Sequence, residues 1–308
     1  MKTKTTKQIK LTIGIPVYNG EKFLEEKITS ILNQDFVDFE LIISDNASTD
    51  STIKICEKYL NKDSRITLVK QNKNIGPLWN FYSVLEKARG DYFVWLADDD
   101  YWHPDFLLEN VSVLDNHKNV VCSIGKINPF DKLPKNGIKE ESVKYPKLIE
   151  NYVISRRNQM ISVTYPVSGS YSKKVRQFLK NPGSNSRFYG LYRKEILQKC
   201  FIKNDFIAVV NAIFLNLLKY GDLYEVDKIL LYRFNQGSST TGIINQSRLY
   251  NKIPLGTIFP YISFNSWCLK NIGLKNVLRN LDIFARMNVG GFLFFGIDLI
   301  LKIRNRFL

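Results

Sequence analysis

The chain has 308 residues, of which 44% are apolar and 24% charged, and its formal net charge is +15. This balance allows a sizeable core to form, so it excludes a disordered or low-complexity protein. The length favours one large domain, or one domain with an extension. The four cysteines lie far apart in sequence without metal-ligand spacing, so we expect reduced thiols in the core.

The positive charge is concentrated in two parts of the chain. Residues 132–203 contain 16 basic and 4 acidic side chains, and residues 252–308 contain 8 basic and 2 acidic ones. Nucleic acid, an anionic membrane surface and a phosphorylated substrate are the partners that such an excess can serve. Because no nucleic-acid-binding module is recognisable, we do not expect a nucleic-acid partner.

Short β-branched runs alternate with helical patterns over the first 125 residues. This alternation predicts a parallel sheet with helices on both faces. The Lys-rich segment 126–190 reads instead as loops and short elements. The expected strands are 11–17, 39–44, 66–70, 92–97, 120–124 and 223–234, and the expected helices cover 23–32, 53–59, 78–88, 104–116 and about 204–220.

Polar residues follow three of these strands at the point where each strand ends. Tyr18 and Asn19 follow the first strand, Asp45 closes the second, and Asp98 begins an acidic run after the fourth. Because parallel sheets bind ligands beyond the carboxyl ends of their strands, we expect a ligand site at this edge.

Three consecutive carboxylates, Asp98, Asp99 and Asp100, follow an apolar run. Adjacent carboxylates repel one another unless a cation holds them, and a hard divalent ion prefers such oxygen ligands. The alternative is a solvated turn that places acidic residues favourably before the next helix. Asp45 leaves two interpretations open in the same way, an ordinary Asx turn or an acceptor for a base edge or ribose hydroxyl.

The motifs taken together resemble family 2 glycosyltransferases, which are inverting, nucleotide-sugar-dependent enzymes of the GT-A fold. The resemblance implies an α/β fold with a Rossmann-like, mostly parallel sheet flanked by helices, and a C-terminal helical extension. It covers about a third of the chain and rests on Pro16-Val17-Tyr18-Asn19, Ser44 to Asp50, Asn72 to Gly76, and Gly90 through Ala97-Asp98-Asp99-Asp100 to Pro104-Asp105.

The resemblance also implies a role for each matching position. Asp99 and Asp100 would hold Mn²⁺ or Mg²⁺ at the diphosphate. Ala97 stands where the family's first metal-site aspartate is usual, which leaves open whether Asp98 replaces it. The residues that would bind the donor nucleotide are Pro16, Tyr18, Asn19, Asp45, Asn74 and Asp98.

The second half of the chain matches the family less closely. Asp205 falls at the position of the family's catalytic base, although Asn204 replaces the preceding glutamate. The alternative is that Asp205 only caps the following helix. Arg193 and Arg233 lie in stretches that the family uses on the acceptor side, and Asn235 stands where the second stretch commonly has histidine.

We therefore expect a glycosyltransferase domain over residues 1–250 and a helical tail over 251–308. The domain would consist of a nucleotide-sugar half, 1–125, and an acceptor-side half, 126–250. The tail mixes apolar and basic side chains, so it either lies at a lipid interface or packs on the core with a basic edge. Residues 1–10 are polar and basic rather than typical of a secretory signal, so we expect a cytoplasmic protein, which works at the inner face of the cell membrane if the tail lies at a lipid interface.

The resemblance implies transfer of a sugar from a nucleotide-diphosphate donor, with a UDP-sugar favoured, to a glycan or polyprenyl-pyrophosphate-linked acceptor. This reaction would belong to bacterial surface polysaccharide synthesis. Two alternatives remain open: a sugar-nucleotide nucleotidyltransferase, and a non-catalytic nucleotide-sugar-binding protein of the same fold. The first would require a Gly-rich basic loop after the first strand, and the second would have no need of the carboxylates.

Overall fold

The computed structural model describes residues 8–96, 100–130, 164–180, 185–234, 256 and 258–307. The chain divides into two compact units, which we call the sheet unit and the helical unit. This division differs from the expected boundary at residue 250, because two earlier segments group with the C-terminal helices. The sheet unit comprises residues 1–166, 183–199 and 223–236, and the helical unit comprises residues 167–182, 200–222 and 237–308.

One eight-stranded sheet, of order β3-β2-β1-β4-β7-β6-β8-β5, forms the sheet unit. β1 pairs in parallel with β2 and β4, and β2 pairs in parallel with β3. β7 runs antiparallel to both β4 and β6, and β5 runs antiparallel to β8. The strands are β1 (Leu11–Val17), β2 (Phe39–Asp45), β3 (Ile66–Lys70), β4 (Tyr92–Trp95), β5 (Tyr101–Trp102), β6 (Val120–Phe130), β7 (Leu191–Arg193) and β8 (Asp222–Phe234).

The four helices predicted over 23–32, 53–59, 78–88 and 104–116 are present close to these positions, and the described part of the sheet unit has two further short helices that were not predicted. At the start of the second helix, Asp50 Oδ1 accepts a hydrogen bond from the Thr52 backbone N–H at 3.0 Å, while the N-cap residue Ser51 forms no side-chain capping bond. These helices are α1 (Leu24–Leu32), α2 (Thr52–Leu60), α3 (Pro77–Lys87), α4 (Phe106–Asn116), α7 (Lys194–Cys200) and the short 3₁₀ helix η1 (Asn185–Tyr189).

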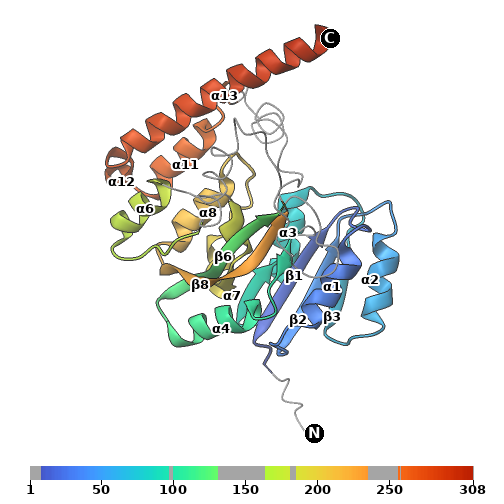
Figure 1. The fold of residues 1–308 in the computed structure, drawn as a ribbon. Coiled ribbons are helices and arrows are strands. Elements are labelled where there is room, and N and C mark those ends of the chain that lie inside the picture. Colours follow the sequence, from blue (N-terminus) through green and yellow to red (C-terminus); the bar gives the residue numbers. More distant parts are fainter. Residues whose placement is uncertain are drawn as a thin grey trace, which may run out of the picture. The chain divides into compact units, whose positions relative to one another are not determined.

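Alternation along β1 explains why helices cover both faces of the sheet. Side chains two apart point to the same face, and Ile13 and Ile15 join one core cluster with Ile28 of α1 and Cys56 of α2. Gly14 points to the opposite face, where an added Cβ would lie 2.9 Å from Val84 Cγ2 of α3. Figure 1 shows α1 and α2 together beside β1, β2 and β3. The missing side chain at position 14 therefore lets α3 approach the sheet closely.

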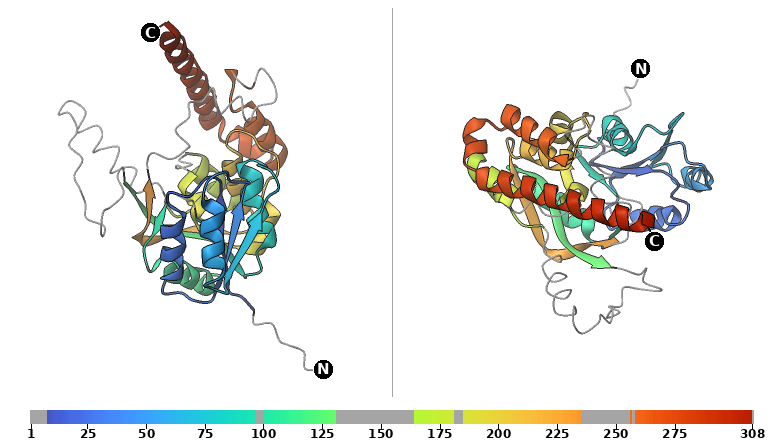
Figure 2. Two further views of the ribbon diagram at one scale, coloured as in Figure 1. Left: turned by 90° about the vertical axis from the view of Figure 1, so that its right-hand side faces the viewer. Right: turned by 90° about the horizontal axis from the view of Figure 1, so that it is seen from above.

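The helical unit contains α6 (Tyr171–Lys180), α8 (Val209–Leu217), α11 (Ile262–Asn271), α12 (Leu274–Leu278) and α13 (Leu281–Phe307). Aromatic pairs join these helices: Phe178 and Phe214 have ring centroids 5.5 Å apart, and Phe264 and Phe284 6.3 Å apart. Figure 2 shows α13 as one continuous helix. Among the helices as the structure describes them, none is both long and apolar enough to cross a membrane.

All four cysteines, which lie in the described part of the chain, are buried and none forms a disulfide. The prediction of thiols in the core is thus confirmed. Burial raises the pKa of the Cys122 thiol to about 12, so this thiol stays protonated at neutral pH.

A Gly90→Ala substitution should destabilise the protein strongly. The added Cβ would lie 2.6 Å from the Leu11 carbonyl carbon and the Thr12 nitrogen, both of which are backbone atoms of β1. We expect the free energy of unfolding to fall by about 2 kcal/mol or more. Overpacking costs about 1–3 kcal/mol, and the backbone atoms of β1 cannot rotate away from the added Cβ as a flexible side chain could. Thermal and urea denaturation measure this loss.

Gly290→Ala is the matched control, because nothing lies within 4 Å of its added Cβ. Its stability should be unchanged or higher, since alanine is favoured over glycine by about 1 kcal/mol within helices. Equal stability of the Gly90→Ala protein and the wild type would contradict the close approach.

Candidate functional site

The carboxyl ends of β1 and β2 lie side by side. The two strands end in register, with Val17 opposite Asp45. The Asn46 backbone N–H then donates to the Val17 carbonyl at 2.9 Å, which extends the pairing by one residue beyond β2. The polar loops that follow the two strands therefore start from the same edge of the sheet, as the sequence predicts.

Asn19 joins these two loops. Its φ of +52° lies in the left-handed region, which asparagine tolerates better than most residues. Its backbone N–H donates to Ser48 Oγ at 2.8 Å, and its Oδ1 accepts from the Thr49 backbone N–H at 2.8 Å. The side chain of this predicted nucleotide-binding residue is thus engaged in loop structure.

A pocket of about 200 Å³ opens at this edge. It brings together Pro16, Tyr18 and Asn74, three of the residues predicted to bind a nucleotide. The Tyr18 side chain is 46% exposed, and Asn74 Oδ1 accepts from Asn46 Nδ2 at 3.1 Å. The pocket is lined by Pro16, Val17, Tyr18, Asn46, Asn74, Pro77, Asn80 and Phe81.

Asn80 is a pocket residue that the sequence analysis missed. It is 3% exposed, and its Nδ2 donates to the Ser44 carbonyl at 3.0 Å and to the Val17 carbonyl at 3.4 Å. Its Oδ1 accepts from Ser44 Oγ at 2.6 Å. One amide therefore holds the ends of both strands. The sequence does contain one indication of its role. Asn80 lies four residues before the apolar Val84, and residues four apart share one face of a helix, so Asn80 lies on the buried face of α3.

The carboxylate of Asp45 is 2% exposed. Its Oδ2 accepts from the Ser48 backbone N–H at 3.1 Å, three residues along the chain, so this oxygen is held within the loop but does not form an Asx turn, which bonds two residues on. Its Oδ1 is buried and has no hydrogen-bond partner among the described residues. Burial and then the Asp45 charge raise the pKa of the Cys56 thiol to about 12. A buried oxygen without a partner costs free energy unless a ligand supplies a donor.

Of the acidic run, only Asp100 lies in the part of the chain that the structure describes. It is 1% exposed, and its carbonyl accepts a hydrogen bond from Nζ of Lys27, which is itself fully buried. The Lys27 ammonium also lies over the Tyr101 ring, 3.0 Å from its centroid. Asp98 and Asp99 are outside the described residues. Within those residues, no group of three or more His, Cys, Asp or Glu side chains could hold a metal.

Asp205 belongs to the helical unit and lies just before α8. The alternative that it caps this helix does not hold, because the N-cap is Ala208, with φ +68° and no side-chain capping bond. α8 consequently begins at Val209, five residues later than expected. Desolvation raises the pKa of the Asp205 carboxyl above its ordinary value, against the opposing effect of a hydrogen bond from the Phe206 backbone.

The two arginines predicted on the acceptor side differ in what the structure shows. Arg193 pairs with Tyr92, the first residue of β4, and so lies at the other end of that strand from the pocket edge. Its guanidinium donates to the carbonyls of Leu114, Val120 and His117. This position supports a structural role and gives no support to an acceptor contact. Arg233 lies within β8, and its side chain is outside the described part.

Comparison with protein families gives a match to the model of "Glycosyl transferase family 2" over residues 12–201. One curated relative is the GalNAc(5)-diNAcBac-PP-undecaprenol beta-1,3-glucosyltransferase of Campylobacter jejuni. It is 28% identical over 244 residues, which cover 78% of this chain and 71% of the relative. Two other curated relatives match a shorter stretch of this chain. The chain spans 48% of the length of the first of these relatives and 21% of the length of the second.

Two solved structures share the fold. S. aureus TarS 1-349 in complex with UDP-GlcNAc has a TM-score of 0.52 at 18% identity, covering 90% of this chain and 79% of that one. The mannosyltransferase PcManGT from Pyrobaculum calidifontis, in complex with GDP-Man and Mn²⁺, has a TM-score of 0.56 at 14% identity. That match covers 97% of this chain and 76% of the other. These likenesses confirm the expected fold, a mostly parallel sheet flanked by helices with a helical C-terminal region.

An Asn80→Leu substitution should destabilise the sheet unit at this edge. It would remove three hydrogen bonds of a buried amide, those from Asn80 Nδ2 to the Val17 and Ser44 carbonyls and that from Ser44 Oγ to Asn80 Oδ1. The Ser44 hydroxyl keeps Ser83 Oγ and Gln71 Nε2 as neighbours, so we expect a cost of about 1–3 kcal/mol of unfolding free energy. Urea denaturation measures the change. The exposed Asn61→Leu serves as control and should stay within about 0.5 kcal/mol of the wild type. Equal stability of both variants would contradict the role given to the Asn80 amide.

Proposed function

Because the chain belongs to glycosyl transferase family 2, we propose that it is an inverting glycosyltransferase. It transfers a sugar from a UDP-sugar to a hydroxyl of a glycan or a lipid-linked glycan, in the synthesis of a bacterial surface polysaccharide. The donor class is supported by the UDP-GlcNAc complex of TarS, and the acceptor class by the undecaprenol-linked substrate in the name of the Campylobacter relative.

The observation that carries the proposal is the pocket at the ends of β1 and β2. Its volume of about 200 Å³ is below the ~300–1,000 Å³ of pockets that enclose a whole small molecule, so it suits one part of the donor. Pro16, Pro77 and Phe81 offer apolar contacts to a flat base, and Asn74 offers an amide to its polar edge. Asp45 does not line this pocket, but it precedes the lining residue Asn46, and its buried Oδ1 would accept a hydrogen bond from a base or ribose that reaches it.

A divalent metal fits the chemistry of the acidic run. Asp99 and Asp100 would hold it with Asp98 nearby, because three consecutive carboxylates supply the hard oxygen ligands that Mn²⁺ or Mg²⁺ prefers. When bound, the metal neutralises the charge that grows on the diphosphate as its bond to the sugar breaks. The Mn²⁺ in the PcManGT complex supports a divalent ion in this fold.

Asp205 is proposed as the base for the acceptor. Its carboxylate takes the proton of the acceptor hydroxyl, whose oxygen attacks the anomeric carbon from the face opposite the leaving diphosphate. One displacement of this kind inverts the anomeric centre. Desolvation raises the pKa of the Asp205 carboxyl, which makes its carboxylate a stronger base than that of an ordinary aspartate.

The loop after β1 argues against the nucleotidyltransferase alternative. That chemistry needs backbone N–H groups free to cradle a phosphate. Three consecutive amides here are already bonded: Asn19 to Ser48 Oγ, Gly20 to Thr52 Oγ1 and Glu21 to Asp50 Oδ2. The non-catalytic alternative would have no use for Asp205, so loss of turnover with nucleotide binding retained in an Asp205 variant would exclude it.

The proposed acceptor class determines where in the cell the enzyme would work. A lipid-pyrophosphate-linked glycan is presented at a membrane, so the enzyme would work in the cytoplasm against the inner face of the cell membrane, as a peripheral protein. Arg233 would lie on the acceptor side, where positive charge suits an anionic acceptor.

Release of UDP from a panel of nucleotide sugars tests the activity directly. Asp205→Asn should lower kcat about 10²–10⁴-fold, the usual contribution of a general base, and change the Kd for UDP less than about threefold. The exposed Asp35→Asn is the control and should leave kcat unchanged. Wild-type kcat in the Asp205→Asn enzyme would refute the assignment.

The pH profile of kcat/KM is a second test of Asp205 as the general base. A base works only when ionised, so activity should be full at high pH and fall as the pH drops through its pKa. Desolvation raises that pKa, so the acid limb should lie above the value of about 3.9 of an ordinary aspartate. An acid limb at or below that value would show that another group is titrating.

Removal of divalent metal tests the role of the acidic run. EDTA should abolish UDP release, and added Mn²⁺ or Mg²⁺ should restore it. Asp99→Asn should lower kcat at least about a hundredfold at saturating metal, because the lost charge stabilisation amounts to several kcal/mol. Undiminished turnover in EDTA would contradict the assignment of Asp99 and Asp100.

A further inference from the structure

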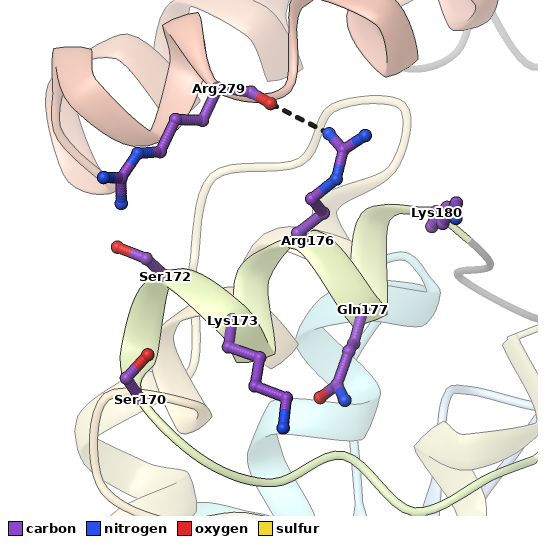
Figure 3. Close-up of a pocket in the computed structure, with 7 residues that line it drawn as sticks. All are labelled: Ser170, Ser172, Lys173, Arg176, Gln177, Lys180 and Arg279. Carbon is purple, nitrogen blue, oxygen red and sulfur yellow. Dashed lines mark hydrogen bonds between the residues drawn. The ribbon is translucent and has the colours of Figure 1, made fainter.

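The helical unit has a basic pocket of its own, of about 470 Å³, which no step of the transfer reaction uses. It is formed by one side of α6 and by the residue between α12 and α13. Figure 3 shows the Arg279 side chain extended toward the end of α6 that carries Ser170 and Ser172. The lining contains four cations and no acidic side chain: Ser170, Ser172, Lys173, Arg176, Gln177, Lys180 and Arg279.

One of the four cations has a structural role. Arg176 Nη1 donates to the Arg279 carbonyl at 2.8 Å and to Asp282 Oδ1 at 3.1 Å, which ties α6 to the start of α13. The other three, Lys173, Lys180 and Arg279, are exposed and form no ion pair with any described residue. The Ser170 and Ser172 hydroxyls stand at the amino end of α6, where the helix dipole also favours an anion. The pocket is therefore suited to a phosphate group.

Exposed apolar side chains continue from Arg279 along both neighbouring helices. Leu278 of α12 is 55% exposed, and Leu281, Val289 and Leu293 of α13 are 54%, 60% and 59% exposed. At about 100° per residue, these three positions of α13 fall within an arc of about 120°. The opposite side of α13 is buried, with Ile283 and Phe284 only 3% and 6% exposed. We call Leu278, Leu281, Val289 and Leu293 the apolar stripe.

We propose that this part of the helical unit docks on an anionic bilayer, with a lipid phosphate group in the basic pocket and the apolar stripe among the acyl chains. A helix with one exposed apolar face and basic neighbours is the kind that lies in a lipid interface. The positive pocket complements the negative charge of the lipid head groups. Its lining contains no acidic side chain, and the nearby Asp282 is paired with Arg176. The inference deepens the membrane contact proposed above and is independent of glycosyl transfer.

Flotation of the purified full-length chain with vesicles tests the docking without any sugar donor. The chain should float with vesicles of phosphatidylcholine and phosphatidylglycerol, and far less with phosphatidylcholine alone. Lys173→Gln/Lys180→Gln/Arg279→Gln should weaken partitioning about a hundredfold, since each basic residue near an anionic surface contributes roughly fivefold. Leu281→Ser/Val289→Ser/Leu293→Ser should weaken it at least about tenfold.

Lys54→Gln/Lys87→Gln/Lys118→Gln is the matched control, because it removes the same charge from exposed lysines of the sheet unit that form no ion pair with a described residue. It should change partitioning less than about threefold, since distant charges are screened over a Debye length of about 8–10 Å. Circular dichroism and thermal denaturation establish that each variant is folded. Equal partitioning of the pocket variant and the control would overturn the proposal.

Calorimetric titration with inorganic phosphate and pyrophosphate distinguishes a lipid from a soluble ligand. If the pocket variant loses binding of these anions but keeps vesicle binding, the ligand is a soluble phosphate and the lipid proposal is wrong. Asp205→Asn should bind vesicles like the wild type. A wild-type protein that floats with vesicles but shows no turnover would contradict the proposed glycosyl transfer. A protein that shows turnover but does not float would contradict the membrane docking.

Discussion

The buried amide of Asn80 fixes the carboxyl ends of β1 and β2, and the candidate donor site depends on that constraint. Its bonds to the Val17 and Ser44 carbonyls hold the two strands where their loops begin. Gly14 and Val84 bring α3 close enough to the sheet for this amide to reach. The pocket is consequently a property of packing between α3 and the sheet, while the loops supply its polar side chains.

The two units differ in the chemistry that they offer. The sheet unit presents buried oxygens at a strand edge, among them Asp45 Oδ1, which a ligand's donor would satisfy. The helical unit presents exposed cations and apolar side chains around Arg279. Asp205 also belongs to the helical unit.

Much of the sheet unit could be predicted from the sequence, because its strands are β-branched runs and its helices carry a clear apolar period. The ends of β1 and β2, where we predict the ligand site, could be located in the sequence for the same reason. Asn80 was missed because a polar residue on a buried helix face is recognised only from its tertiary contacts. β7, with three residues, is too short for a periodic pattern. Arg193 matched a family stretch, but its carbonyl partners come from residues more than seventy positions away.

A structure of the protein crystallised with UDP and Mn²⁺ tests the central claim most directly, which is that the edge formed by β1 and β2 binds the donor nucleotide. The account predicts the uracil ring in the pocket between Tyr18 and Phe81, with a base or ribose donor within hydrogen-bond distance of Asp45 Oδ1. A nucleotide bound elsewhere, with Asp45 Oδ1 still lacking a partner, would contradict it.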